Sequence, residues 1–381
     1  FTIRHAGRTV DPVRDPSRPG GTGAQPRRRQ PVKIALLAPV SLPVPPHGYG
    51  GTELVVHQLA EGLTSQGHEV TLFATGDSET RASLRPLLPR ALTPLGFDSR
   101  DLTIAFERAH AAWLFAQADG FDLIHDHTKS VGVTLAPFVN TPVLTTVHND
   151  FTPARRALYL AHPRHAFVAI SHAHAARCPE LDFEGVVYNG MDLAAPQVRT
   201  RKDDYLLFLG RLCAEKGTHT AIAVAHALEM PLVLAGKIDP LDAAYVREQV
   251  MPHVDGRQVR YIGEVTGQAK WDLLAGARCL LFPIEWPEPF GLVMIEAMAC
   301  GTPVVATRWG SVPEVVAHGK TGWIADDFEG LLEGVRHAAS MDPWEGRAWV
   351  EGRFGTEAMV AGYLEVYGRL LARVRPVSLQ P

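Results

Sequence analysis

Two carboxylates eight positions apart, Glu288 and Glu296, are the most specific chemical signal in the sequence. They belong to the stretch EPFGLVMIEAMACGTPVVAT, in which Glu288 precedes a predicted helix and Glu296 lies within its apolar run. Because an unpaired charge on a buried face is costly, Glu296 is expected to have a polar partner or a ligand. Carboxylates accept hydrogen bonds from vicinal hydroxyls, which sugars and riboses present in pairs. The two acids can therefore face one pocket from different depths.

Two cations precede another predicted helix. Arg211 and Lys216 lie in GRLCAEKGTHTA, and the helix is expected to begin near Thr218. A helix N-terminus offers free N–H groups, and two cations beside it would complete an anion site of pyrophosphate size. The alternative is a surface arginine and lysine in solvent.

A glycine-rich segment, PVPPHGYGGTE, leads into a helix predicted to open at about Thr52. Glycines here allow the backbone to approach an anion at the helix N-terminus. Gly48 and Gly50 fit the first two glycines of the dinucleotide fingerprint GxGxxG, but Glu53 occupies the third place and no GK[ST] follows. A plain tight turn remains the alternative.

Polar side chains follow several predicted strands of the first half. In FDLIHDHTK, strand alternation places His125 and His127 on the same face of the strand, opposite to Asp126. Two histidines at this spacing can ligate zinc, but no third ligand stands out, so a ligand-facing hydrogen-bonding role is favoured. Other strand ends carry His148, Asn149, Ser171 and Asn189, which together suggest a polar cleft wall.

These residues require a scaffold of alternating strands and helices. From Val32 onward, short β-rich runs alternate with helical patterns, which is typical of parallel α/β sheets. The polar segment Ala194–Asp204 interrupts the series, and the same alternation restarts at Tyr205. We therefore predict two doubly wound domains, 31–198 and 199–355, and an amphipathic helix over 356–375 that could pack on either one.

Composition limits the class of protein. The chain has 381 residues, a net charge of -4 and 20% charged residues, which argues against a general nucleic-acid binder. The four cysteines show no CxxC pairing, so we expect a reduced, cytoplasmic protein without disulfides or a metal site. Residues 1–30 are rich in Arg, Pro and Gly, and are predicted to form a disordered tail.

The motifs GYGGTE, DLIHDH, YNGMD, GRLCAEKG and EPFGLVMIE, taken in order, closely resemble the GT4 family of retaining glycosyltransferases. The resemblance covers nearly everything after Pro31. It implies the GT-B fold, in which two Rossmann-like domains face a cleft and the final helix crosses back to the first domain. It also implies transfer of a sugar from a nucleoside diphosphate sugar to an acceptor hydroxyl, with retention and without an obligatory metal or cofactor.

The resemblance assigns roles to particular residues. Arg211 and Lys216 match the pair that grips the diphosphate, Glu296 the ribose-binding acid, and Glu288 the acid that contacts the donor sugar. The remaining assignments are His127 near the reacting sugar, Phe290, Gly291 and Leu292 beside sugar and phosphate, and Gly50 and Gly51 facing the diphosphate and acceptor.

A finer resemblance concerns the donor. The PVSLPVPPHGYGG loop and the IEWPEPFG segment with Trp286 resemble a subgroup that includes UDP-glucose:tetrahydrobiopterin glucosyltransferases, which suggests UDP-glucose. A small molecule, a lipid or a glycan remains open as acceptor, and so does peripheral membrane contact through Arg155, Arg156 and Arg164. The alternatives are a nucleotide-sugar epimerase and a non-catalytic sugar-nucleotide-binding protein. Glu53 in the fingerprint disfavours an NAD oxidoreductase.

Overall fold

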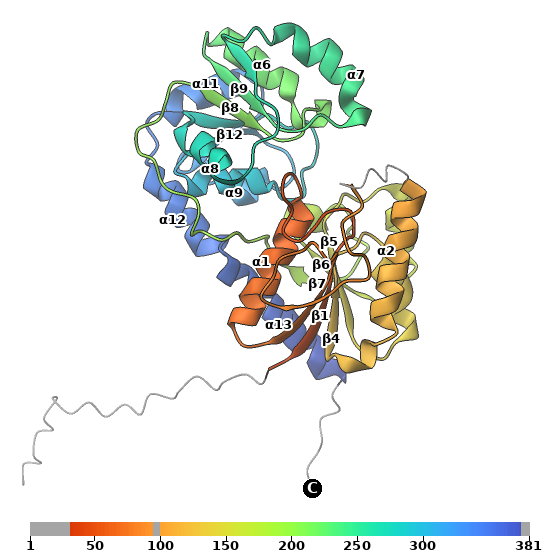
Figure 1. Ribbon diagram of the computed structural model, residues 1–381. Coiled ribbons are helices and arrows are strands. Elements are labelled where there is room, and N and C mark those ends of the chain that lie inside the picture. The colour runs from red at the N-terminus through yellow and green to blue at the C-terminus, as the bar shows by residue number, and fades with distance from the viewer. Residues whose placement is uncertain (1–30, 94–99, 375–381) are drawn as a thin grey trace, which may run out of the picture. The chain divides into compact units, whose positions relative to one another are not determined.

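A computed structural model of the chain describes residues 31–93 and 100–374 (Figure 1). The predicted tail over 1–30 lies outside the described residues. The described chain contains two parallel β-sheets, one of seven strands and one of six. This confirms the prediction of two α/β domains from the two series of strand and helix patterns.

The first sheet has the strand order β3-β2-β1-β4-β5-β6-β7. Its strands are β1 (Lys33–Leu37), β2 (Glu69–Phe73), β3 (Ser83–Arg85), β4 (Leu123–Asp126), β5 (Val143–Val147), β6 (Ala166–Ala169) and β7 (Phe183–Val186). The helices of this part are α1 (Gly51–Ser65), α2 (Arg100–Phe115), η2 (Ala118–Gly120), α3 (Val131–Leu135), η3 (Ala136–Phe138), α4 (Pro153–Leu160) and α5 (His172–Ala175). Because apolar clusters cover both faces of the sheet, its central strands read as nearly continuous apolar runs.

The second sheet has the order β10-β9-β8-β11-β12-β13. Its strands are β8 (Leu206–Leu209), β9 (Leu232–Ala235), β10 (Val259–Tyr261), β11 (Cys279–Phe282), β12 (Val304–Thr307) and β13 (Gly322–Ala325). The helices are η4 (Ala214–Lys216), α6 (Thr218–Ala227), η5 (Pro240–Asp242), α7 (Ala243–Tyr245), η6 (Val246–Val250), η7 (Met251–His253), α8 (Gly267–Gly276), α9 (Leu292–Ala299), α10 (Val312–Val315), α11 (Phe328–Ala338), α12 (Pro343–Arg353) and α13 (Thr356–Val374). In each sheet the strand order reverses beside the first strand, where open α/β sheets bind ligands.

The last helix, α13, follows the second sheet in the sequence but packs in the core of the first (Figure 1). Val360 and Tyr363 belong to the same apolar cluster as Val56 and Leu59 of α1. Tyr363 and Tyr367 are fully buried, and their hydroxyls reach polar atoms of β4 and β5. The helix therefore adds both apolar and polar contacts to the first sheet.

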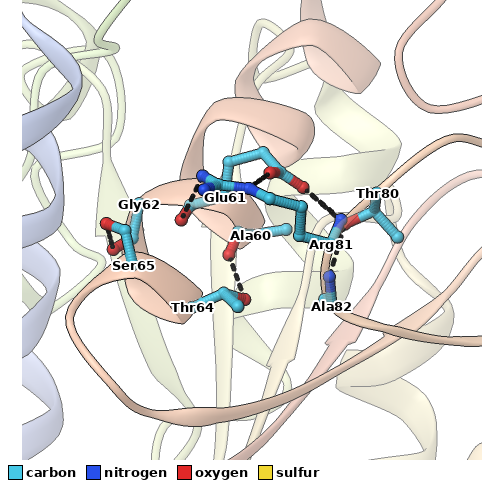
Figure 2. A network of polar contacts seen from close by, with 8 residues as sticks. All are labelled: Ala60, Glu61, Gly62, Thr64, Ser65, Thr80, Arg81 and Ala82. Atoms are coloured by element: carbon cyan, nitrogen blue, oxygen red, sulfur yellow. Dashed lines mark hydrogen bonds and ion pairs between the residues drawn. The ribbon is translucent and has the colours of Figure 1, made fainter.

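A polar network fixes the far end of α1 (Figure 2). Glu61 accepts hydrogen bonds from the Arg81 guanidinium and from Thr80 Oγ1, the latter at 2.7 Å. Burial acts to raise the pKa of Glu61, but the hydrogen bonds from Arg81 and Thr80 outweigh it and hold that pKa below its ordinary value. The network ties α1 to the segment that leads into β3, and so anchors the helix whose other end carries the glycine loop.

Two of the three arginines considered for membrane contact have protein partners. Arg155 donates to the carbonyl of Asp150, and Arg156 pairs with Glu180. Within residues 31–93 and 100–374, no helix combines the length and apolarity needed to cross a bilayer.

Candidate active site

Lys216 and Glu288 form a buried ion pair where two loops of the second sheet meet. Lys216 lies between β8 and α6, and Glu288 lies between β11 and α9. Their side chains are 14% and 11% exposed. Burial would lower the pKa of Lys216, but the charge and hydrogen bond of Glu288, together with smaller contributions from Tyr49 and Cys213, outweigh it and hold that pKa above its ordinary value. The lysine is therefore a fixed cation at neutral pH.

Close backbone contact brings these two loops together. A Cβ atom at Gly217 would lie 1.8 Å from the carbonyl oxygen of Pro283, so a glycine is required there. The backbone N–H of Glu285 donates to the carbonyl of Glu215 at 2.8 Å. Lys216 and Glu288 thus meet because their loops are joined through the backbone on both sides of the pair.

The loop after β12 supports Glu288 from the other side. Ser311 donates its backbone N–H to the Glu288 carbonyl at 3.0 Å, and its hydroxyl to the Phe290 carbonyl at 2.8 Å. Gly310 has φ 53°, and a Cβ there would lie 2.3 Å from the Glu288 carbonyl oxygen. The backbone of Glu288, Phe290 and Gly291 is therefore held at the N-terminus of α9.

Glu296 has the partner that its burial requires. It is 6% exposed, and Lys270 of α8 places its ammonium 2.6 Å from Glu296 Oε1. Lys270 could not be recognised as this partner from the sequence, because a lysine near the start of another helix is ordinarily a solvated surface residue. The ion pair occupies one carboxylate oxygen of Glu296.

Arg211 does not join the Lys216 pair. Its guanidinium lies 3.2 Å from Asp242 Oδ2 and 3.1 Å from Glu215 Oε2. The two cations predicted to act together are thus bound to different carboxylates in this structure. Lys237, which the sequence analysis missed, lies 4.8 Å from the ring centroid of Tyr49 in the glycine loop.

The glycine loop of the first sheet contacts the second. Tyr49 donates its backbone N–H to Glu264 Oε1 at 2.6 Å. A Cβ at Gly51 would lie 3.5 Å from Leu292 Cδ1, in ordinary van der Waals contact. Gly50 packs so closely on Pro46 that a Cβ there would lie 2.7 Å away. The structure therefore brings Gly51 to the N-terminal end of α9, whereas Gly50 packs within its own loop.

His127 keeps one nitrogen unpartnered, whereas His125 does not. His127 Nδ1 lies 2.9 Å from His148 Nε2, while His127 Nε2 is buried with no hydrogen-bond partner among the described residues. His125 uses both nitrogens, with Tyr367 at 2.7 Å and Thr146 at 2.8 Å. The expectation that both histidines face a ligand was wrong for His125, because α13 covers it.

Burial sets the charge state of the histidine pair. It lowers the pKa of His148 to about 3, with the nearby His174 as a smaller cause. Burial also places the pKa of His127 well below its ordinary value, with His125 and His148 contributing. Both rings are therefore neutral at pH 7, and His127 acts as a hydrogen-bonding group rather than a cation.

The other residues predicted to form a polar cleft wall differ in their hydrogen-bond partners. Ser171 donates its hydroxyl to the carbonyl of Pro289 at 2.7 Å, which ties it to the loop carrying Glu288. Asn149 accepts from His174 Nε2 at 3.1 Å through its backbone carbonyl. Asn189 is buried, and its Oδ1 has no partner among the described residues.

Glu314 of α10, in the second domain, also contacts the first domain. Glu314 accepts hydrogen bonds from the backbone N–H groups of His172 and Ala173, at 2.8 and 2.6 Å. The Tyr188 hydroxyl donates to the same carboxylate at 2.9 Å. This contact lies beside Ser171, so it fixes the strand end that reaches Pro289.

The described residues contain no group of three or more His, Cys, Asp or Glu side chains arranged to hold a metal. All four cysteines, Cys178, Cys213, Cys279 and Cys300, are free and buried. A cavity of about 320 Å³ lies elsewhere, lined by residues that include Lys202 and Arg278 and by none of the predicted site residues.

Two family models match the chain in succession. The model described as Glycosyltransferase Family 4 matches residues 49–195, and the one described as Glycosyl transferases group 1 matches residues 193–344. A glycogen synthase from Mycobacterium tuberculosis is 28% identical over 356 residues, covering 78% of this chain and 84% of that protein.

Solved structures share the fold over nearly the whole chain. The crystal structure of AviGT4, a glycosyltransferase involved in avilamycin A biosynthesis, is 30% identical with a TM-score of 0.70, covering 90% of this chain and 99% of that one. HepE from Anabaena, crystallised with UDP and glucose, is similar in fold, with 21% identity, a TM-score of 0.70, and coverage of 89% and 100%. The two Rossmann-like domains thus form a GT-B fold, and the chain belongs to the GT4 family of glycosyltransferases.

Proposed function

We propose that this enzyme transfers glucose from UDP-glucose to an acceptor hydroxyl with retention of the anomeric configuration. The observation that carries the proposal is the buried Lys216–Glu288 ion pair, which sets a cation and a hydroxyl-binding acid side by side. Glu296 lies on the helix that follows the same loop. The choice of UDP-glucose rests on the resemblance of the IEWPEPFG and PVSLPVPPHGYGG segments to the tetrahydrobiopterin glucosyltransferase subgroup.

The chemistry requires positive charge where the leaving group forms. When the bond between the anomeric carbon and the β-phosphate oxygen breaks, negative charge develops on that phosphate. Lys216, and Arg211 if it turns from Asp242, would stabilise this charge. Glu288 would hold hydroxyls of the glucose, and Glu296 those of the ribose.

Retention is explained by a front-face substitution. The acceptor oxygen bonds to the anomeric carbon on the side that the phosphate leaves, and the departing β-phosphate oxygen takes the acceptor proton. The products are the glucoside and UDP. His127 Nε2, which has no partner among the described residues, would hydrogen-bond to the sugar when the first domain closes on the donor. The predicted catalytic residues are thus Arg211, Lys216, Glu288 and His127.

Ligand-induced stabilisation followed by product analysis tests the proposal. UDP and UDP-glucose should raise the melting temperature more than GDP, ADP or their sugars do. Incubation with UDP-glucose and candidate small-molecule, lipid and glycan acceptors should then yield an α-linked product by the anomeric proton coupling in NMR. EDTA should leave the rate nearly unchanged. A β-linked product would contradict retention, and an epimerised sugar without transfer would indicate an epimerase.

A further inference from the structure

Trp286 contacts both members of the Lys216–Glu288 pair. Its indole Nε1–H donates to Glu288 Oε2 at 3.0 Å, and the Lys216 ammonium lies 5.1 Å from the centroid of its ring. Phe282 presents a second ring 5.6 Å from the same ammonium. The pair is therefore enclosed by aromatic faces and joined to one of them by a directed hydrogen bond.

The two donors to Glu288 reach the same oxygen. Both Lys216 Nζ and Trp286 Nε1 bind Oε2, and Oε1 accepts no hydrogen bond from the described residues. The carboxylate is thus oriented with one oxygen directed at the protein and the other left for a ligand. Since Ser311 and Gly310 fix the backbone of Glu288, the remaining freedom is rotation of its side chain, which Trp286 restrains.

From this geometry we propose that Trp286 is the positioning residue for Glu288 during sugar transfer, an inference that rests on the proposed function. When Lys216 is drawn to the diphosphate, Glu288 loses its ionic partner while still buried. A buried carboxylate without partners tends to rotate or take up a proton. The Trp286 N–H remains bound to Oε2 and keeps Oε1 aimed at the donor sugar.

Replacing Trp286 by phenylalanine distinguishes the contribution of the N–H hydrogen bond from that of the aromatic ring. The Phe ring still supports the Lys216 ammonium, but the N–H donor to Glu288 is lost. We expect kcat to fall about tenfold to a hundredfold, the range of a hydrogen bond to a charged group. The dissociation constant for UDP should change less than about twofold, because a single hydrogen bond to the sugar-binding acid leaves the nucleotide contacts intact.

The split between turnover and nucleotide affinity supplies a readout that a purely structural role would not move. Loss of the hydrogen bond should lower kcat while the UDP dissociation constant and the melting temperature stay near those of the wild type, because only the orientation of Glu288 changes. Trp286→His, which restores a ring N–H, should recover part of kcat relative to Trp286→Leu.

Trp349→Phe is the matched control. Trp349 lies in the same part of the chain, donates its Nε1–H to the Val315 carbonyl at 2.8 Å, and carries the Arg353 guanidinium 4.4 Å from its ring centroid. The control should keep the wild-type kcat and the wild-type UDP dissociation constant. If Trp286→Phe does not melt cooperatively, the comparison of kcat between Trp286→His and Trp286→Leu tests the positioning role instead.

Three outcomes would overturn the inference, and only the first also rejects the proposed function. If the wild-type enzyme transfers no sugar from any nucleotide sugar, the proposed function fails and the role of Trp286 fails with it. If the wild type is active while Trp286→Phe matches Trp349→Phe in kcat, only the positioning role is rejected. Equal kcat in the folded His and Leu variants would reject it as well.

Discussion

Lys216 and Glu296 differ in the part of the donor that each is predicted to hold, so their replacement should have different kinetic effects. Lys216→Ala removes the cation where charge develops in the transition state, and kcat should fall on the order of 100- to 1000-fold. Glu296→Ala removes a ribose contact present before and during the reaction, so UDP affinity should fall roughly 10- to 100-fold. Single-turnover rates and UDP titrations measure the two effects separately.

Glu296→Gln provides a control for the second variant, because it keeps the shape of the side chain and loses the charge that Lys270 pairs with. It should fold as the wild type does and bind UDP with intermediate affinity. Near-wild-type kinetics in both alanine variants would contradict the assignment of both residues.

The sequence singled out Glu288 and Glu296 but not their partners. Glu288 and Glu296 stand out because a charge in an apolar run needs an explanation, and burial within the structure supplies the reason. Lys270 and the indole N–H of Trp286 could not be inferred as partners, because each pairing depends on how separate segments fold against one another. His125 was misjudged for the same reason, since its partner Tyr367 comes from the last helix.

At the level of elements, Gly310 is expected to control the geometry of the loop between β11 and α9. Gly310→Ala would place a Cβ 2.3 Å from the Glu288 carbonyl oxygen at a φ of 53°. The loop must shift, so kcat should fall at least about tenfold, in line with the sensitivity of catalysis to a displacement near 1 Å.

Gly319→Ala is the control variant, because it introduces the backbone strain of a left-handed alanine without the steric clash that Gly310→Ala produces. Gly319 has φ 76°, and a Cβ there would meet nothing within 4 Å. Both variants bear the cost of a left-handed alanine, about 1 kcal/mol of stability. Only Gly310→Ala should lose activity, as measured by kcat together with chemical denaturation. A fully active Gly310→Ala would show that the loop tolerates the displacement.

Sequence patterns located most strands because parallel strands buried on both faces form short apolar runs. The strand β3 was missed, since Ser83–Arg85 is only partly buried and shows no such run. The amphipathic pattern of α13 alone did not decide its packing, because it fits either sheet equally well, and only the family resemblance predicted that the helix crosses back to the first domain. Which core it joins depends on Tyr363 and Tyr367 meeting the polar atoms of the first sheet.

For the whole molecule, buried histidines predict a loss of stability in mild acid. Burial is the largest cause that lowers the pKa of His148 to about 3 and the pKa values of His165 and His174 to about 4. In the unfolded chain each would titrate near 6.5. Between about pH 6.5 and 4 the unfolded chain therefore binds protons that the native protein excludes, and stability falls as the pH is lowered.

Buried carboxyl groups act in the opposite direction. Burial raises the pKa of Asp126 from 3.8 to about 6, and it also raises the pKa values of Glu53 and Glu107, so lowering the pH favours the native state at these three groups. The buried histidines with lowered pKa values outnumber them, and each excluded proton costs up to about 1.4 kcal/mol per pH unit. The melting temperature should therefore be roughly 5 to 10 °C lower at pH 5 than at pH 7.

His165→Gln tests whether buried histidines cause the fall in stability between pH 7 and pH 5. The ring of His165 lies 2.8 Å from Thr145 Oγ1, a contact that a glutamine amide can replace without titrating. The variant should lose less stability between pH 7 and pH 5 than the wild type in calorimetry. A wild-type melting temperature that is unchanged or higher at pH 5 would refute the prediction.

The pairing of site cations with protein carboxylates has a consequence for product release. Lys216 is bound to Glu288, and Arg211 to Asp242 and Glu215, before any donor arrives. After transfer, the same acids remain tethered next to the cations, at an effective concentration well above that of free nucleotide. In the proposed function these acids would compete directly with the spent diphosphate and hasten its release, so the arrangement would favour rapid turnover over retention of the product.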